Sequence, residues 1–153
     1  MREGRDRRPS AVHAVPLLAL SLFACGEMKK ATECSAVIDS VNAAAAAEPK
    51  DTKKDDFSED VKLLAESIAK LEKVEVTDAG LKKRVGDYRG ILKDTADTLQ
   101  AMDALAKKAE KPGDQADVDK MTEEALALEK KLRDLDDGQE KIVEDLNAYC
   151  GRE

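Results

Sequence analysis

Apolar side chains recur at alternating steps of three and four residues along most of the chain beyond residue 30. Four series of this kind are present, at residues 31–45, 57–71, 81–106 and 118–149. This spacing places the apolar side chains on one face of an α-helix and is typical of coiled-coil-like packing. The pattern predicts four amphipathic helices, in which Thr95 and Gln139 are polar members of otherwise apolar faces.

The stretches between the series carry residues that end and cap helices. Residues 111–114, with the sequence KPGD, are expected to end the third helix and to supply Asp114 as the cap of the fourth. Thr77 and Ser58 are the predicted caps of the third and second helices. Because all the connections are short, neighbouring helices should run antiparallel. The sequence therefore predicts an all-α, single-domain, up-down-up-down four-helix bundle.

The first 24 residues differ in character from this helical part. Four arginines within the first eight residues precede an apolar run from Ala11 to Phe23. A run of about thirteen residues covers roughly 20 Å as a helix, which is too short for the ~30 Å core of a bilayer. A basic start, a short apolar run and a small residue, Ala24, are the marks of a secretory signal peptide. The alternative is a soluble protein with an accidental apolar amino terminus.

Residues Leu22, Phe23, Ala24 and Cys25 resemble the lipobox of bacterial lipoproteins. The resemblance covers residues 1–26 and says nothing of the rest of the chain. It implies that the signal is removed before Cys25 and that the thiol of Cys25 receives a lipid. The expected division of the chain is a signal peptide at 1–24, a lipidated tether at 25–30 and a helical bundle domain at 31–153.

This resemblance also implies a location at the cell envelope. In the family, an aspartate directly after the cysteine retains the protein at the inner membrane, and here that position is Gly26. An outer-membrane anchor is therefore favoured, with the domain facing the periplasm or the cell exterior.

The charge of the processed chain limits the kinds of partner. Removal of residues 1–24 leaves 22 basic and 31 acidic residues, a net charge of −9. Nucleic acids and anionic lipid surfaces both require clustered Lys and Arg. We therefore expect no nucleic-acid partner and expect the lipid alone to hold the protein at the membrane.

The two remaining cysteines, Cys34 and Cys150, form an even pair in a compartment outside the cytosol, which favours a disulfide. Cys34 lies near the start of the first predicted helix and Cys150 at the end of the fourth, so an up-down-up-down bundle brings both to one pole. The alternative is two unrelated buried thiols. The short tether places this pole next to the membrane and the turn at residues 111–114 away from it.

Catalytic chemistry has few candidate residues. The only histidine, His13, leaves with the signal, so the processed chain has no imidazole base to pair with a nucleophile. Three aspartates precede Gly138, but a calcium loop in that register would have Arg133 and Leu135 at ligand positions. There is no glycine-rich phosphate loop. The sequence predicts a non-enzymatic protein without a metal or cofactor.

The expected function is contact with another envelope protein through the turn that projects from the membrane. The candidate contact residues are Lys107, Lys108, Lys111, Pro112, Gly113 and Asp114. The alternative is a bundle that binds a small apolar ligand or lipid near Thr95, Met102 or Gln139. An enzyme using carboxylates alone is the third possibility. Gly86 and Gly90 are expected to permit a close helix contact, and the oligomeric state is left open.

Overall fold

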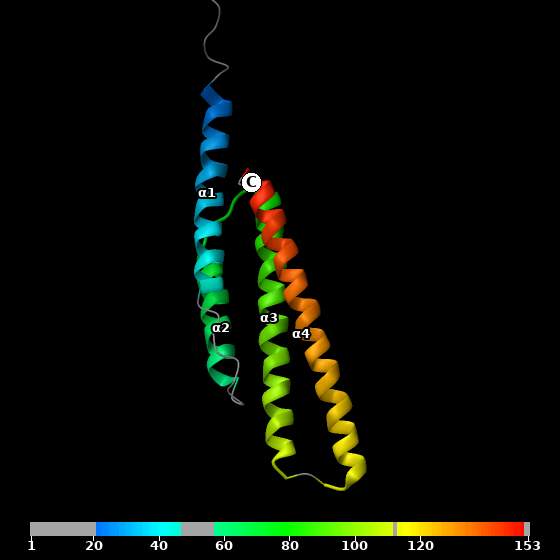
Figure 1. Ribbon diagram of the computed structural model, residues 1–153. Coiled ribbons are helices and arrows are strands. Elements are labelled where there is room, and N and C mark those ends of the chain that lie inside the picture. Colours follow the sequence, from blue (N-terminus) through cyan, green and yellow to red (C-terminus); the bar gives the residue numbers. More distant parts are fainter. Residues whose placement is uncertain (1–20, 47–56, 112, 152–153) are drawn as a thin grey trace, which may run out of the picture.

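The chain folds into four α-helices in the computed structural model, which describes residues 21–46, 57–111 and 113–151 (Figure 1). The helices are α1 (Ser21–Ala46), α2 (Ser58–Glu72), α3 (Ala79–Ala109) and α4 (Gln115–Tyr149). The described residues contain no strand. The prediction of an all-α four-helix bundle is confirmed, and α3 and α4, with 31 and 35 residues, are the long helices as expected.

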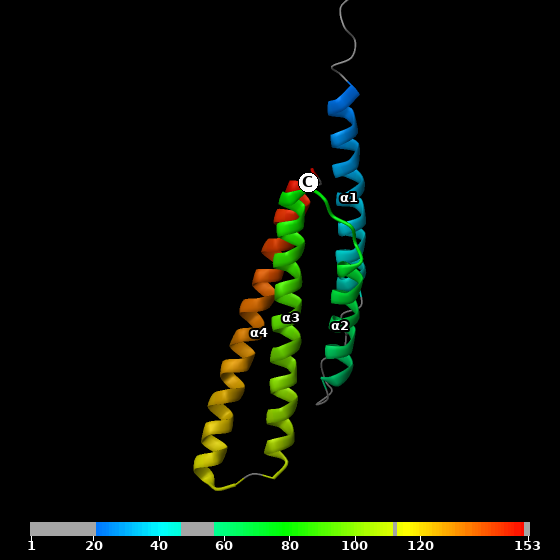
Figure 2. The ribbon, with the colours of Figure 1, turned by 180° about the vertical axis from the view of Figure 1, so that it is seen from behind.

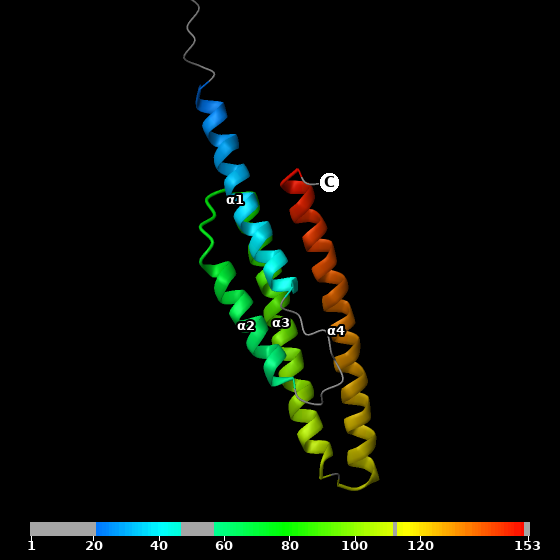
Figure 3. The ribbon, with the colours of Figure 1, turned by 60° about the vertical axis from the view of Figure 1, so that its left-hand side comes forward.

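The four helices do not run side by side over their full lengths. Helix α3 is central and packs against both α2 and α4, while α1 packs mainly against α2. In all three views (Figures 1, 2 and 3) the α3–α4 hairpin extends beyond the start of α2, and α1 extends the opposite way beyond the end of α4. The molecule therefore has a four-helix body at one end and a two-helix hairpin at the other.

The core lies in the four-helix body. The side chains that are essentially inaccessible to solvent are Val37, Leu71, Leu81, Tyr88, Leu92, Thr98 and Leu146. Along the predicted face of α3, residues Leu81 to Leu92 are buried, whereas Met102 and Ala106 are only half-buried. The apolar face continues toward the hairpin turn, but α1 and α2 cover only the part nearest the disulfide.

The first helix begins earlier than the sequence pattern indicates. Helix α1 starts at Ser21, ten residues before the expected start at Ala31, and continues through the predicted cleavage position before Cys25. The predicted signal at 1–24 lies mostly outside the described residues. Removal of this segment and lipidation of Cys25 stay predictions.

Two of the three predicted helix caps are wrong. Asp114 does cap α4, because its carboxylate accepts a hydrogen bond from the backbone N–H of Asp117 at 3.1 Å. The cap of α3 is Asp78, whose Oδ1 accepts from the N–H of Leu81 at 2.7 Å, and not Thr77. Ser58 lies inside α2, and the residue before it makes no side-chain cap.

The glycines that permit close helix contacts are not the predicted ones. A Cβ atom at Gly86 or Gly90 would meet open space, so that prediction is wrong. A Cβ at Gly80 would lie 2.3 Å from the hydroxyl oxygen of Tyr149, and one at Gly138 would lie 3.1 Å from a methyl carbon of Ile91. These two glycines allow α3 and α4 to approach each other.

Candidate functional site

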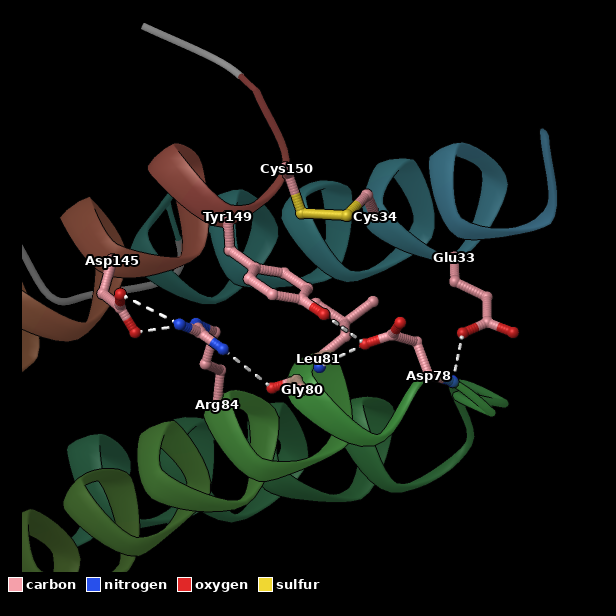
Figure 4. The surroundings of a disulfide bond; sticks show 9 residues. All are labelled: Glu33, Cys34, Asp78, Gly80, Leu81, Arg84, Asp145, Tyr149 and Cys150. Carbon is pink, nitrogen blue, oxygen red and sulfur yellow. Dashed lines mark hydrogen bonds and ion pairs between the residues drawn. A yellow bond between two sulfur atoms is a disulfide. The ribbon is translucent and has the colours of Figure 1, made fainter. Parts of the chain in front are cut away.

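The disulfide end of the body brings together side chains from distant parts of the sequence. Cys34 of α1 is bonded to Cys150 at the end of α4, with 5.7 Å between their Cα atoms (Figure 4). The predicted pairing is confirmed. The bond closes a sequence separation of 116 residues and joins the first helix to the last.

Tyr149 of α4, next to Cys150, contacts both α1 and the start of α3 at this end. Its hydroxyl donates to Asp78 Oδ1 at 2.7 Å (Figure 4). Its ring lies 3.8 Å from the Lys30 ammonium and 4.0 Å from the Arg84 guanidinium, measured to the ring centroid. Both are cation–π contacts. The hydrogen bond to Asp78 raises the pKa of Tyr149 above its ordinary value.

Glu33 binds the connection between α2 and α3. Its carboxylate accepts hydrogen bonds from the Thr77 hydroxyl and from the backbone N–H groups of Thr77 and Asp78, both at 3.0 Å. The Thr77 hydroxyl is the main cause of a lowered pKa for Glu33. The pKa of Asp78 is lowered too, chiefly by the Leu81 N–H and then by the Tyr149 hydroxyl.

This cluster joins α1, α3 and α4 to one another. Its carboxylates already accept hydrogen bonds from the chain, and Arg84 binds Asp145 and the carbonyl of Gly80 (Figure 4). Within the described ranges, no group of three or more His, Cys, Asp or Glu side chains is arranged to hold a metal ion. We therefore assign the disulfide end a structural role.

A second feature is an apolar groove near the end of the α3–α4 hairpin, with a volume of about 560 Å³. Its lining residues are Phe57, Met102, Leu105, Ala106, Ala109, Val118, Met121, Thr122 and Ala125. The one hydroxyl among them, on Thr122, donates to the carbonyl of Val118 at 2.9 Å. The groove thus presents mainly apolar surface.

The local sequence explains why a groove forms here. Alanines occupy facing positions of the two helices, at Ala106 and Ala109 of α3 and at Ala125 of α4. A small side chain fills less of the space between two helices than leucine does. Helix α2 begins at Ser58, and Phe57, the residue before it, is the last side chain from this part of the chain to line the groove.

The predicted contact residues lie at the end of the same hairpin. Lys107 forms an ion pair with Asp103, and Lys108 and Lys111 are exposed. Asp114 caps α4, and Gly113 is exposed beside Asp117. Pro112 lies outside the described residues. None of the five described residues lines the groove, although Lys107 and Lys108 lie between its lining residues Ala106 and Ala109 on α3.

The three residues predicted to surround a ligand pocket are not brought together. Met102 lines the groove, but Thr95 and Gln139 do not. The Thr95 hydroxyl donates to the carbonyl of Ile91 at 2.9 Å, and Gln139 is half-buried farther along α4. Phe57 and the alanines were not predicted from the sequence as lining residues. The replacement of leucine by alanine toward the hairpin turn was the signal that could have identified them.

Comparison with known proteins adds no functional assignment. No family model, no curated protein and no solved structure matches this chain. None of the four helices, as far as residues 21–46, 57–111 and 113–151 go, has the length and apolar character needed to cross a bilayer.

Proposed function

We propose that the chain is a lipoprotein of the cell envelope, anchored through a lipid on Cys25, whose helical bundle acts by binding a partner protein and catalyses no reaction. The lipobox-like sequence at residues 22–25 supports the anchor. The processed chain has no histidine, and both cysteines other than Cys25 are joined in the disulfide, which supports a non-enzymatic role.

The observation that carries this proposal is the placement of the apolar groove at the end of the hairpin. Helix α1 starts at the opposite end of the molecule (Figure 1). A lipid on Cys25 would hold the disulfide end next to the membrane and would present the groove away from it. An uncovered apolar surface rimmed by charged residues is typical of a protein-binding site.

The direct test is capture of partners from native envelopes. The tagged chain is cross-linked in cells that make it naturally, purified, and its companions are identified by mass spectrometry. We expect one protein in near-equal amount with the natural chain, and its loss with Ala125→Phe, which fills the groove. Ala127→Phe, at an exposed position outside the groove, is the matched control and should retain the partner.

The anchor is tested separately by the substitution Cys25→Ala. We expect this variant to accumulate as an unlipidated precursor and to lose the membrane-dependent partner. A processed protein of normal mass from this variant would show that Cys25 is not the lipidation site.

A second function, binding of a small apolar ligand or lipid, is favoured by the size of the groove. Its volume of about 560 Å³ lies within the range of small-molecule sites, and Met102 is among its lining residues. Extraction of the purified chain and mass spectrometry of the extract should then yield a defined lipid from the natural chain and none from Ala125→Phe. An extract without any lipid rejects this second function.

A further inference from the structure

The length of the groove limits what fills it. Met102 and Ala109 of α3 are seven residues apart, which is about 10 Å along a helix, and Val118 and Ala125 of α4 span the same distance. An occupant with apolar side chains at positions i, i+3 or i+4, and i+7 of a helix matches this length. Leu126, one turn beyond Thr122, is 59 % exposed and extends the apolar surface beyond the groove.

The two walls of the groove differ in charge. On α4 and its cap, residues 114–129 carry six acidic side chains and one lysine, all exposed. The facing part of α3 and the residues after it, 97–111, carry three acidic side chains and three lysines. The segment of α4 that forms one wall of the groove is therefore strongly acidic, and the facing segment of α3 has no net charge.

Acidic side chains on this wall lie close to the apolar lining. Asp117 is four residues before Met121 and Glu124 is three residues after it, so both are neighbours of Met121 on the helix surface. In the described part of the chain, neither carboxylate forms an ion pair with a lysine or arginine. Both are available to a cationic occupant.

We propose that the groove binds an amphipathic helix of a partner protein, with apolar side chains seated between α3 and α4 and with lysines or arginines directed at the acidic wall of α4. The inference rests on the proposed function and names the chemistry of the partner. It combines an apolar groove of helical length with charge complementarity, which favours association and selects among partners.

The same charges disfavour the other occupants. A second copy of the chain would bring an identical acidic wall to the interface, and like charges at close range oppose association. A fatty acid would bring its carboxylate to an acidic rim. A neutral alkyl chain would form no ion pair with the carboxylates of the acidic wall.

The test uses synthetic helical peptides of about four turns with leucines on one face and a single tryptophan among them. One peptide carries lysines on its polar face, a second carries glutamates there, and a third is a scrambled form of the lysine peptide. Each is titrated against the full chain in phosphatidylcholine nanodiscs, with empty nanodiscs as the blank. Because the chain contains no tryptophan, a blue shift of the peptide fluorescence reports burial in the protein.

Matched variants locate the binding site. We expect Ala125→Phe to weaken binding of the lysine peptide about tenfold or more and Ala127→Phe to leave it unchanged. The pair Asp117→Lys and Glu124→Lys should also weaken binding, whereas Asp136→Lys with Glu140→Lys, the same charge change on exposed positions farther along α4, should not. The surface pair remains informative if the buried phenylalanine disturbs folding.

Several results would overturn the inference. These are equal binding of the lysine and scrambled peptides, equal binding of the glutamate peptide, no effect of Ala125→Phe, or a dimer of the chain that Ala125→Phe dissociates. A further outcome is that no peptide binds while the natural partner is still captured by the natural chain and lost with Ala125→Phe. That result would support the proposed protein-binding function and reject a cationic helix as the occupant.

Discussion

At the scale of single residues, contacts with side chains distant in sequence decide which of two candidate residues caps a helix. Thr77 has the sequence features of a helix cap, but Glu33, 44 residues earlier, binds its hydroxyl and its backbone N–H. Asp78 then caps α3 and also accepts from Tyr149. Asp114 was predictable because no distant residue competes with it for the cap of α4. Local sequence alone cannot reveal a contact such as that of Glu33.

The contacts of Glu33 predict an acid-dependent contribution to stability. The pKa of Glu33 is lowered in the folded chain from an ordinary value of 4.5. Between the lowered value and 4.5 the unfolded chain binds more protons, so stability is lost as the pH falls through this window. Denaturant unfolding of the natural chain and of Glu33→Gln should show the largest difference near neutral pH. A difference that persists undiminished at pH 2 would contradict the assignment.

The glycines of α3 give a second prediction at this scale. Gly86 faces open space, so Gly86→Ala should raise the free energy of unfolding by about 1 kcal/mol through helix propensity. Gly80→Ala should gain less or lose stability, because the new methyl group would displace the Tyr149 ring. Thermal unfolding of the two variants gives the comparison. Equal stabilisation by both would mean that the close approach at Gly80 is absent in solution.

At the scale of helices, the spacing of apolar residues predicted the number and order of the elements and that α3 and α4 are the long ones, but not the early start of α1. It did not predict where one helix stops covering another. The apolar faces of α3 and α4 extend from the level of Phe57 toward the hairpin turn. The spacing of apolar residues is the same whether or not a third helix covers those faces. The groove is therefore revealed only by the structure, in which α2 begins some distance from the hairpin turn and leaves part of the α3–α4 face uncovered.

Because α1 and α2 cover only the part of α3 nearest the disulfide, we expect local stability to vary along α3. Amide hydrogens of its body segment, residues 81–92, are expected to exchange about tenfold or more slowly than those of residues 101–109 in the hairpin. Hydrogen exchange followed by mass spectrometry measures both segments in one experiment. Uniform protection along α3 would indicate that the groove is closed in solution.

The disulfide acts on α1, the helix whose apolar face ends in alanines. By the chain-entropy estimate, a closed loop of this length stabilises the fold by about 4 to 5 kcal/mol. Denaturant unfolding of Cys34→Ser with Cys150→Ser should show a loss of this order or smaller, with α1 losing its protection against hydrogen exchange first. Unchanged stability after removal of both cysteines would show that packing alone holds α1.

At the scale of the whole molecule, the two ends differ in their side-chain contacts, and we propose that they differ in their roles. The end with the disulfide, Tyr149 and Glu33 fixes the helices to one another and lies toward the proposed anchor. The other end has an apolar groove between an acidic segment of α4 and a segment of α3 without net charge. The sequence predicted this polarity because the positions of Cys34 and Cys150 set the topology. It could not predict the groove, which depends on how far α2 reaches.

The most direct test of this division is a photo-cross-linking amino acid placed at Thr122, which lines the groove and has an exposed side chain. The same group at Asp136, an exposed residue of α4 outside the groove, serves as the control. Irradiated native envelopes should yield one covalent adduct from position 122 alone, joined to a basic, amphipathic helical segment of another protein. An adduct with lipid, an adduct with a second copy of the chain, or the same products from both positions would contradict the account.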